Sequence, residues 1–145
     1  MGEAVVGDDV AVNDKVRVAR AVMDGFAVRD RERLVSLFTP DVEFRTRVDV
    51  TGETEFQGHD GARSWLASVD DKYDRFEIAD AEYRAGDGDA VFVSCRLRLR
   101  YAGDRYGMSR VAYWVIRVDE SQGRVRAFTS FRDRSEALAA AGVSG

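Results

Sequence analysis

The chain has 145 residues, of which 45% are hydrophobic and 33% are charged. This length and composition are typical of one folded globular domain and exclude a disordered chain. The 22 basic and 26 acidic side chains give a net charge of −4, which argues against a nucleic-acid partner or an acidic membrane surface. No apolar run approaches the roughly 20 residues that a bilayer-spanning helix needs.

Residues 1–12 lack the basic start and apolar core of a signal peptide, and we expect them to form a flexible lead-in. A single domain is expected over residues 13–142. The chain has one cysteine, Cys95, so no disulfide can form within it. Both features are consistent with a cytoplasmic location.

Apolar residues at helical spacing predict a first helix over residues 13–29, with Asn13 as its N-cap. Gly25 interrupts this pattern at a cost of about 1 kcal/mol relative to alanine, which indicates that another element packs closely there. Asp30 is expected to cap a short second helix, and Pro40 is expected to end it.

Alternating apolar and polar residues predict a strand over residues 42–48, followed by a loop. A third helix is expected next, capped by Asp60 or His59. Its apolar stripe consists of Ala62, Trp65, Leu66 and Val69.

The pattern in the rest of the chain predicts β-structure followed by a short closing helix. Strands are predicted over residues 76–83, 91–101, 107–118 and 124–133, and the helix over residues 135–142. Helices that precede a run of antiparallel strands indicate an α+β fold. A long sheet with one apolar face, covered by amphipathic helices, can curve into a half-open cone that encloses a pocket.

The predicted strand over residues 91–101 has two contrasting faces because side chains alternate along a strand. One face carries Cys95, Leu97 and Leu99 together with Val91 and Val93. The other face carries Arg96, Arg98 and Arg100. We expect the apolar face to line the cone and the arginine face to lie outside, either solvated or paired across a dimer.

Three segments carry a family resemblance: LFTPDVEFR at 37–45, FQGHDGARSWL at 56–66 and GRVRAFTSFRDRSEALAAAG at 123–142. They resemble the SnoaL-like branch of the nuclear transport factor 2-like superfamily, which includes polyketide cyclases and ketosteroid isomerase. The resemblance covers residues 13–142. It implies a cone-shaped, strongly curved, mixed but mainly antiparallel sheet wrapped around a long N-terminal helix, a cystatin-like α+β barrel. It also implies a deep, mostly apolar pocket.

The resemblance does not carry over the catalytic groups. Ketosteroid isomerase uses an Asp base with a Tyr and a protonated Asp. The matching positions here are Thr46, Val22 and Trp114, whose side chains cannot do this work. SnoaL-type cyclases use an acidic residue on the sheet, and the inward positions around residues 112–116 contain none.

His59 and Asp24 remain as candidates for acid–base catalysis. The alternatives are that His59 caps a helix or binds a loop and that Asp24 faces solvent. Cys95 is either a nucleophile or, in our preferred interpretation, a buried inert thiol. No ligand cluster surrounds these residues, so we expect neither a metal nor a cofactor.

A larger set of side chains is expected to line a ligand pocket or, alternatively, to pack as an ordinary core. Thr46 and Ser130 are its polar members. The set is Phe26, Phe44, Thr46, Trp65, Cys95, Leu97, Leu99, Trp114, Phe128 and Ser130.

Two functions stay open at this point. The first is an apolar pocket that binds a small hydrophobic molecule, with a cyclase- or isomerase-like activity that uses non-standard groups. The second is a non-enzymatic binding or assembly module that forms a homodimer. Its interface would be the outer sheet face with Val111, Tyr113, Val115 and Phe131.

Overall fold

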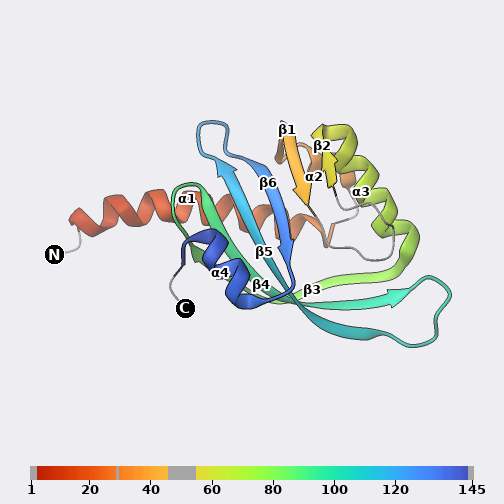
Figure 1. Cartoon of the computed structure of the whole chain (residues 1–145). Coiled ribbons are helices and arrows are strands. Elements are labelled where there is room, and N and C mark those ends of the chain that lie inside the picture. The colour runs from red at the N-terminus through yellow and green to blue at the C-terminus, as the bar shows by residue number, and fades with distance from the viewer. Residues whose placement is uncertain (1–2, 29, 46–54, 144–145) are drawn as a thin grey trace.

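The computed structural model describes residues 3–28, 30–45 and 55–143. Its elements follow the expected order of two helices, a strand, a helix and a run of strands, with one additional short strand (Figure 1). They are α1 (Glu3–Gly25), α2 (Arg31–Val35), β1 (Phe38–Arg45), β2 (Glu55–Gln57), α3 (Gly58–Lys72), β3 (Tyr73–Ala85), β4 (Ala90–Tyr101), β5 (Met108–Asp119), β6 (Arg124–Phe131) and α4 (Arg134–Ala141).

The six strands form one curved sheet in the order β2-β1-β6-β5-β4-β3. Strands β1 and β6 pair in parallel, and all other neighbours pair antiparallel. The sheet is therefore mixed and mainly antiparallel, as expected. It does not close into a complete barrel, because β2 and β3 are its two edges.

The long edge strand β3 contains an irregularity that bends it. Its pairing with β4 shifts between Ala79 and Glu82, and Asp80 between them has a φ of 54°. A bulge of this kind bends a strand and increases its local twist. The bend helps β3 to follow the curvature of the sheet.

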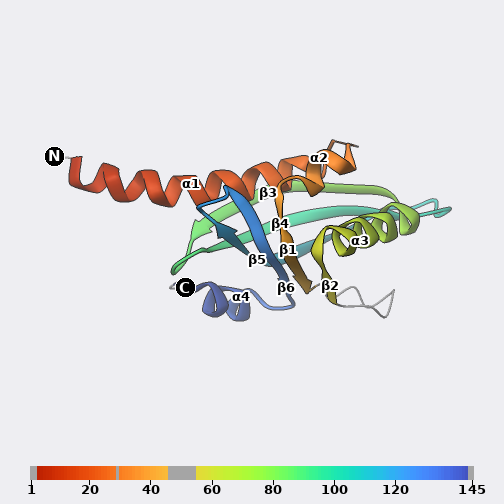
Figure 2. The same ribbon diagram turned by 90° about the horizontal axis from the view of Figure 1, so that it is seen from above.

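Helices cover both faces of the sheet. Figure 2 shows α1 and α4 on opposite sides of the layer that β4, β5 and β6 form, and α3 beside β1 and β2. The inner face and the helices α1 and α3 share one apolar core. From α1 this core takes Ala19, Val22 and Met23, and from the turn directly after α1 it takes Phe26.

The first helix differs from its predicted bounds at both ends. It begins at Glu3, within the segment expected to be a flexible lead-in, and it ends at Gly25 instead of residue 29. Residues 3–12 contain no proline that would stop a helix from extending. The close packing expected at Gly25 is present, since a Cβ atom there would lie 2.9 Å from Cδ1 of Leu34 on α2.

The prediction that Pro40 ends the second helix is wrong. Helix α2 is capped by Asp30 as expected but ends at Val35, and Pro40 lies inside β1. Pairing between β1 and β6 is irregular between Phe38 and Glu43. A proline, which cannot donate a backbone hydrogen bond, is tolerated at such an interruption. The short strand β2, which pairs with the end of β1, was expected to be loop.

The closing helix α4 covers part of the outer sheet face. Its Ala137, Leu138 and Ala141 form a second apolar cluster with Phe92 on β4 and Val115 on β5. Strand β4 is therefore buried on both faces from Ala90 to Cys95. Beyond that point Arg96 and Arg98 are exposed on the outside, as the alternation predicts. The expectation that Val115 lies on an open outer face is wrong, because α4 occupies that position.

The turn between β3 and β4 connects several elements. Lys15 of α1 is buried, and its Nζ donates hydrogen bonds to the carbonyl oxygens of Gly86 at 2.8 Å and Gly88 at 2.7 Å. The backbone N–H of Asp87 donates to the carbonyl of Ala141 in α4 at 2.8 Å. A Cβ on Gly86 would lie 2.0 Å from that same Ala141 oxygen, so this approach requires glycine.

Asp89 joins the same turn to the last two strands of the sheet. Its carboxylate accepts hydrogen bonds from Arg117 on β5 at 3.0 Å and from Arg126 on β6. Partial burial by itself raises the pKa of Asp89. The hydrogen bonds from Arg126 and Arg117 outweigh that effect and hold the pKa below its ordinary value. Asp89 therefore remains ionised and paired at neutral pH.

We predict that Lys15→Met lowers the stability of the protein. The substitution keeps the aliphatic stem but removes the donor to two carbonyls, and an unsatisfied buried acceptor costs about 1–3 kcal/mol. Urea unfolding followed by circular dichroism should show a reduced unfolding free energy. Arg17→Met on the same helix is the control, because Arg17 is 78% exposed. A loss as small for Lys15→Met as for Arg17→Met would contradict this role.

Candidate functional site

Five of the predicted lining side chains meet on the inner face of the sheet. Phe26 lies in the turn directly after α1, and the other four come from β1, α3, β5 and β6. Phe128 is central, with ring centroids 5.0 Å from Trp114, 5.8 Å from Phe44, 5.9 Å from Trp65 and 6.3 Å from Phe26. All five rings are buried. They form the centre of the apolar core on the inner face of the sheet.

The ring pairs are tilted, edge-on or stacked. Trp65 of α3 lies edge-on to Phe26 at 5.5 Å and stacks on Phe44 at 5.4 Å. Such pairs contribute about 0.5–1.5 kcal/mol beyond the area that they bury. Trp65 is thus held in a fixed orientation between α1 and β1.

Strand β4 supplies an apolar wall beside these rings. Cys95, Leu97 and Leu99 are buried, as predicted, and lie opposite Ala112, Arg110 and Met108 of β5. Side chains of such cross-strand partners lie on the same face of the sheet.

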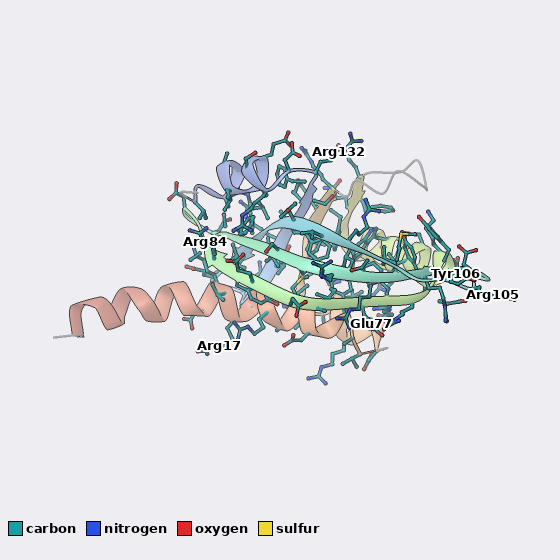
Figure 3. All side chains as sticks on the ribbon, turned by 90° about the horizontal axis from the view of Figure 1, so that it is seen from below. Arg17, Glu77, Arg84, Arg105, Tyr106 and Arg132 are labelled. Carbon is teal, nitrogen blue, oxygen red and sulfur yellow. The ribbon has the colours of Figure 1, made fainter. Side chains whose placement is uncertain are left out.

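Burial along the inner face of β5 shows where the cone opens. Met108 is 41% exposed and Arg110 is exposed, Ala112 is half-buried, and Trp114 is 5% exposed. The inner face therefore opens toward the turn between β4 and β5 and closes toward the other end of β5. Figure 3 shows Arg105 and Tyr106 at this open end, far from the N-terminal end of α1.

One polar atom within the ring cluster has no partner. Trp65 is only 4% exposed, and its Nε1 finds no hydrogen-bond acceptor within the part of the chain that the structure describes. Most buried donors in proteins are paired, and an unpaired one costs about 1–3 kcal/mol. The indole N–H is therefore a buried donor without an acceptor among the described residues.

Cys95 has the environment of an inert thiol. Its side chain is buried on the apolar wall, and burial raises its pKa to about 12. The thiolate is the reactive form, and at neutral pH almost none is present. This supports the interpretation of Cys95 as a buried structural residue and not as a nucleophile.

His59 lies in the first turn of α3, and its Nε2 is 2.9 Å from the carbonyl oxygen of Phe38. The carbonyl can only accept, so Nε2 carries the proton and donates. The expectation that His59 or Asp60 caps the helix is wrong, because the N-cap position is Gln57, which makes no side-chain cap. His59 instead connects α3 to β1.

Asp24 lies on the solvent side of α1 and is exposed. It acts on Tyr83 of β3 through its charge. Burial first, and then the negative charge of Asp24, raise the pKa of Tyr83 to about 12. Asp24 does not face the ring cluster.

Of the two predicted polar lining residues, the structure describes only Ser130. Thr46 lies outside the described residues. Ser130 is half-buried on β6 and pairs in register with Trp114 of β5. Its position next to Trp114 is the one that the alternation of β6 predicts.

Within residues 14–28, 30–45 and 55–143, no Asp, Glu or His side chain is buried. Within the same residues no group of three or more His, Cys, Asp and Glu is arranged to hold a metal ion. The helices of the described ranges include none that is long and apolar enough to cross a membrane.

Residues 19–128 match the family model of the SnoaL-like domain. The match covers most of the chain, and the protein therefore belongs to the SnoaL-like domain family, as the resemblance predicted. No curated protein sequence gives a significant match.

Solved structures support the same fold at low sequence identity. An NTF2-like protein of unknown function from Burkholderia pseudomallei is 18% identical, with 88% of this chain and 97% of that chain aligned and a TM-score of 0.72. A candidate polyketide cyclase from Xanthomonas campestris is 17% identical, with 88% and 96% aligned and a TM-score of 0.70. A candidate isomerase from Bacillus subtilis is 11% identical, with 91% and 97% aligned and a TM-score of 0.71.

Further matched structures have a ketosteroid isomerase-like or a cystatin-like fold. At these identities the comparisons confirm the predicted fold and leave the chemistry of the site to its own residues.

We predict that Cys95 resists thiol reagents in the folded protein. Because its pKa is about 12 and its side chain is buried, Ellman's reagent at pH 8 should not react with it. Full reaction is expected in urea. A variant that combines Cys95→Ala with Tyr106→Cys, which places the thiol on the exposed turn between β4 and β5, should react quickly when folded. Equal rates for the two proteins would contradict the inert-thiol interpretation.

Proposed function

We propose that this protein binds a small hydrophobic molecule at the open end of the cone, against the aromatic inner face. The observation that carries this proposal is the buried Nε1 of Trp65, which has no acceptor among the described residues. A ligand with a carbonyl or ether oxygen would supply that acceptor. The apolar wall of Leu97 and Leu99 suits the remainder of such a molecule.

The relatives support a cyclase- or isomerase-like reaction as the purpose of such binding. Two of the matched structures are described as a candidate polyketide cyclase and a candidate isomerase. No carboxylate or imidazole is buried in the described part of this chain. A reaction here would therefore depend on the inner face holding a folded hydrophobic substrate in a reactive orientation. Non-standard groups would replace the buried acid or base that the described residues do not provide.

We predict that aromatic ketones bind and that Trp65 contributes a hydrogen bond. Isothermal titration calorimetry with acetophenone, 2-acetylnaphthalene and 9-acetylanthracene should show saturable binding, with 2-acetylnaphthalene among the binders. Trp65→Phe keeps an aromatic ring but removes the N–H, and should weaken the binding of 2-acetylnaphthalene about tenfold, since one hydrogen bond contributes about 1.4 kcal/mol.

The matched control is a ligand and not a variant. 2-Ethylnaphthalene has a similar size but no acceptor, so Trp65→Phe should leave its affinity within about twofold. A loss of the same size for both ligands would assign the effect to altered packing. The proposal fails if none of the three ketones binds saturably up to its solubility limit.

A second function, a homodimeric binding or assembly module, is supported by the part of the outer sheet face that α4 leaves open. Val111 on β5 is 48% exposed there, opposite Arg96 of β4. Both signs of charge border it, because Arg98 of β4 pairs in register with Glu77 of β3. A two-fold interface can place the arginine of one copy against the glutamate of the other.

We predict that the protein sediments as a dimer at micromolar concentration and that Val111→Lys shifts it toward the monomer. A lysine at this position would bury a charge beside Arg96 in the interface. Analytical ultracentrifugation checks both statements. Tyr106→Ser, at the exposed turn between β4 and β5, is the control and should leave the dimer intact. A wild-type monomer at this concentration would exclude the dimer.

A further inference from the structure

We propose that the hydrophobic ligand is an acid and that Arg110 binds its carboxylate at the open end of the cone. This inference rests on the proposed function, because it names the class of molecule that the same inner face would take. It depends on the position of Arg110, on the absence of a partner for its guanidinium among the described residues and on the spacing to the aromatic rings.

Arg110 is the charged residue on the inner row of β5. Inner-facing positions alternate along this strand through Met108, Arg110, Ala112 and Trp114. Cross-strand pairing sets Arg110 opposite Leu97 of β4, which is buried on the apolar wall. Its guanidinium therefore stands at the boundary between this wall and solvent.

The guanidinium of Arg110 is available. It makes no ion pair or hydrogen bond with any residue of the described ranges, whereas Arg96 of the outer face donates to Ser109 at 3.2 Å. Arg75, also on the outer face, pairs with Glu77 at 2.9 Å.

The neighbour on which Arg110 acts is Tyr73 at the start of β3. Burial raises the pKa of Tyr73, as do the charge and hydrogen bond of Tyr101, while the positive charge of Arg110 acts in the opposite direction. Arg110 thus lies near Tyr73, whose ring is 5.8 Å from that of Phe76. The ring of Phe76 lies 6.2 Å from that of Phe26, which connects Tyr73 to the central cluster.

The spacing along β5 suits an aromatic acid. Four residues of a strand cover about 13 Å, so this length separates the Cα atoms of Arg110 and Trp114. The residue between them on the same face is Ala112, which has a small side chain, is half-buried and packs against the edge of the apolar core. A molecule of two fused rings can lie over Ala112 with a carboxylate at Arg110. Arginine can hold that carboxylate through two parallel hydrogen bonds.

The competing interpretation is that the stem of Arg110 only covers Leu97 while its head group stays in water. The two interpretations differ in ligand preference. A purely covering arginine gives no advantage to a carboxylate over a neutral molecule of the same shape, whereas a binding arginine does.

The test compares 2-naphthoate with 2-naphthamide by isothermal titration calorimetry at pH 7.5 and low salt. The two ligands have nearly the same shape and differ in charge. Wild-type protein should bind the acid about tenfold more tightly than the amide. Arg110→Gln should remove this preference, and 0.5 M NaCl should reduce it in the wild type because salt screens exposed charges. Arg105→Gln, at the β4–β5 turn, is the matched control and should keep the preference (Figure 3).

The outcomes separate this inference from the proposed function. If 2-acetylnaphthalene binds while the acid shows no advantage over the amide, the role of Arg110 is overturned and the hydrophobic site stands. The same conclusion follows if Arg105→Gln and Arg110→Gln reduce the preference equally, because the effect then comes from general charge. If none of the three ketones binds and neither 2-naphthoate nor 2-naphthamide binds, the proposed function fails and this inference fails with it.

Discussion

The hydrogen bonds from the buried Lys15 ammonium to the carbonyls of Gly86 and Gly88 fix the first helix to the turn between β3 and β4. A buried charge needs such partners, because its desolvation is costly. In the same turn the N–H of Asp87 donates a hydrogen bond to α4, and the carboxylate of Asp89 accepts hydrogen bonds from β5 and β6. The helix inside the cone and the helix outside it are thus both positioned by Gly86, Asp87 and Gly88 of this turn. Phe26 occupies its place in the ring cluster because α1 is fixed there.

Local patterns predicted most of the fold. Alternation in β4 and β5, the apolar stripe of α3 and the Asp30 cap of α2 are properties of short segments, and the structure has all of them. The failures have non-local causes. Pro40 in the sequence predicts the end of a helix, but it lies within β1, where the irregular pairing between β1 and β6 tolerates a proline. Three residues are too few to identify β2. The burial of Val115 depends on where α4 docks, which alternation cannot show.

The candidate site was predictable to the same extent. Alternation and helical spacing indicated the inward rings of Phe44, Trp114 and Phe128, and the structure brings these rings together. The sequence does not indicate which buried polar atoms have hydrogen-bond partners. The missing acceptor at Trp65 and the paired carbonyls at Lys15 depend on distances between elements far apart in the chain. The arginines of β4 form the prominent charged pattern of the sequence, whereas Arg110 is the single charged residue of the inward row of β5, where alternation places it.

The contact between Asp87 and Ala141 has a consequence for synthesis. A ribosome adds about 5–20 residues per second, so the β3–β4 hairpin leaves it several seconds before α4 is made. During this interval Lys15 can already bind the hairpin turn, but Phe92, and Val115 once β5 has been made, have no helix over them. The nascent chain therefore exposes an apolar strip on its growing sheet, a surface that holdase chaperones bind. Proteolytic removal of the C-terminal helix from the mature protein would expose the same strip.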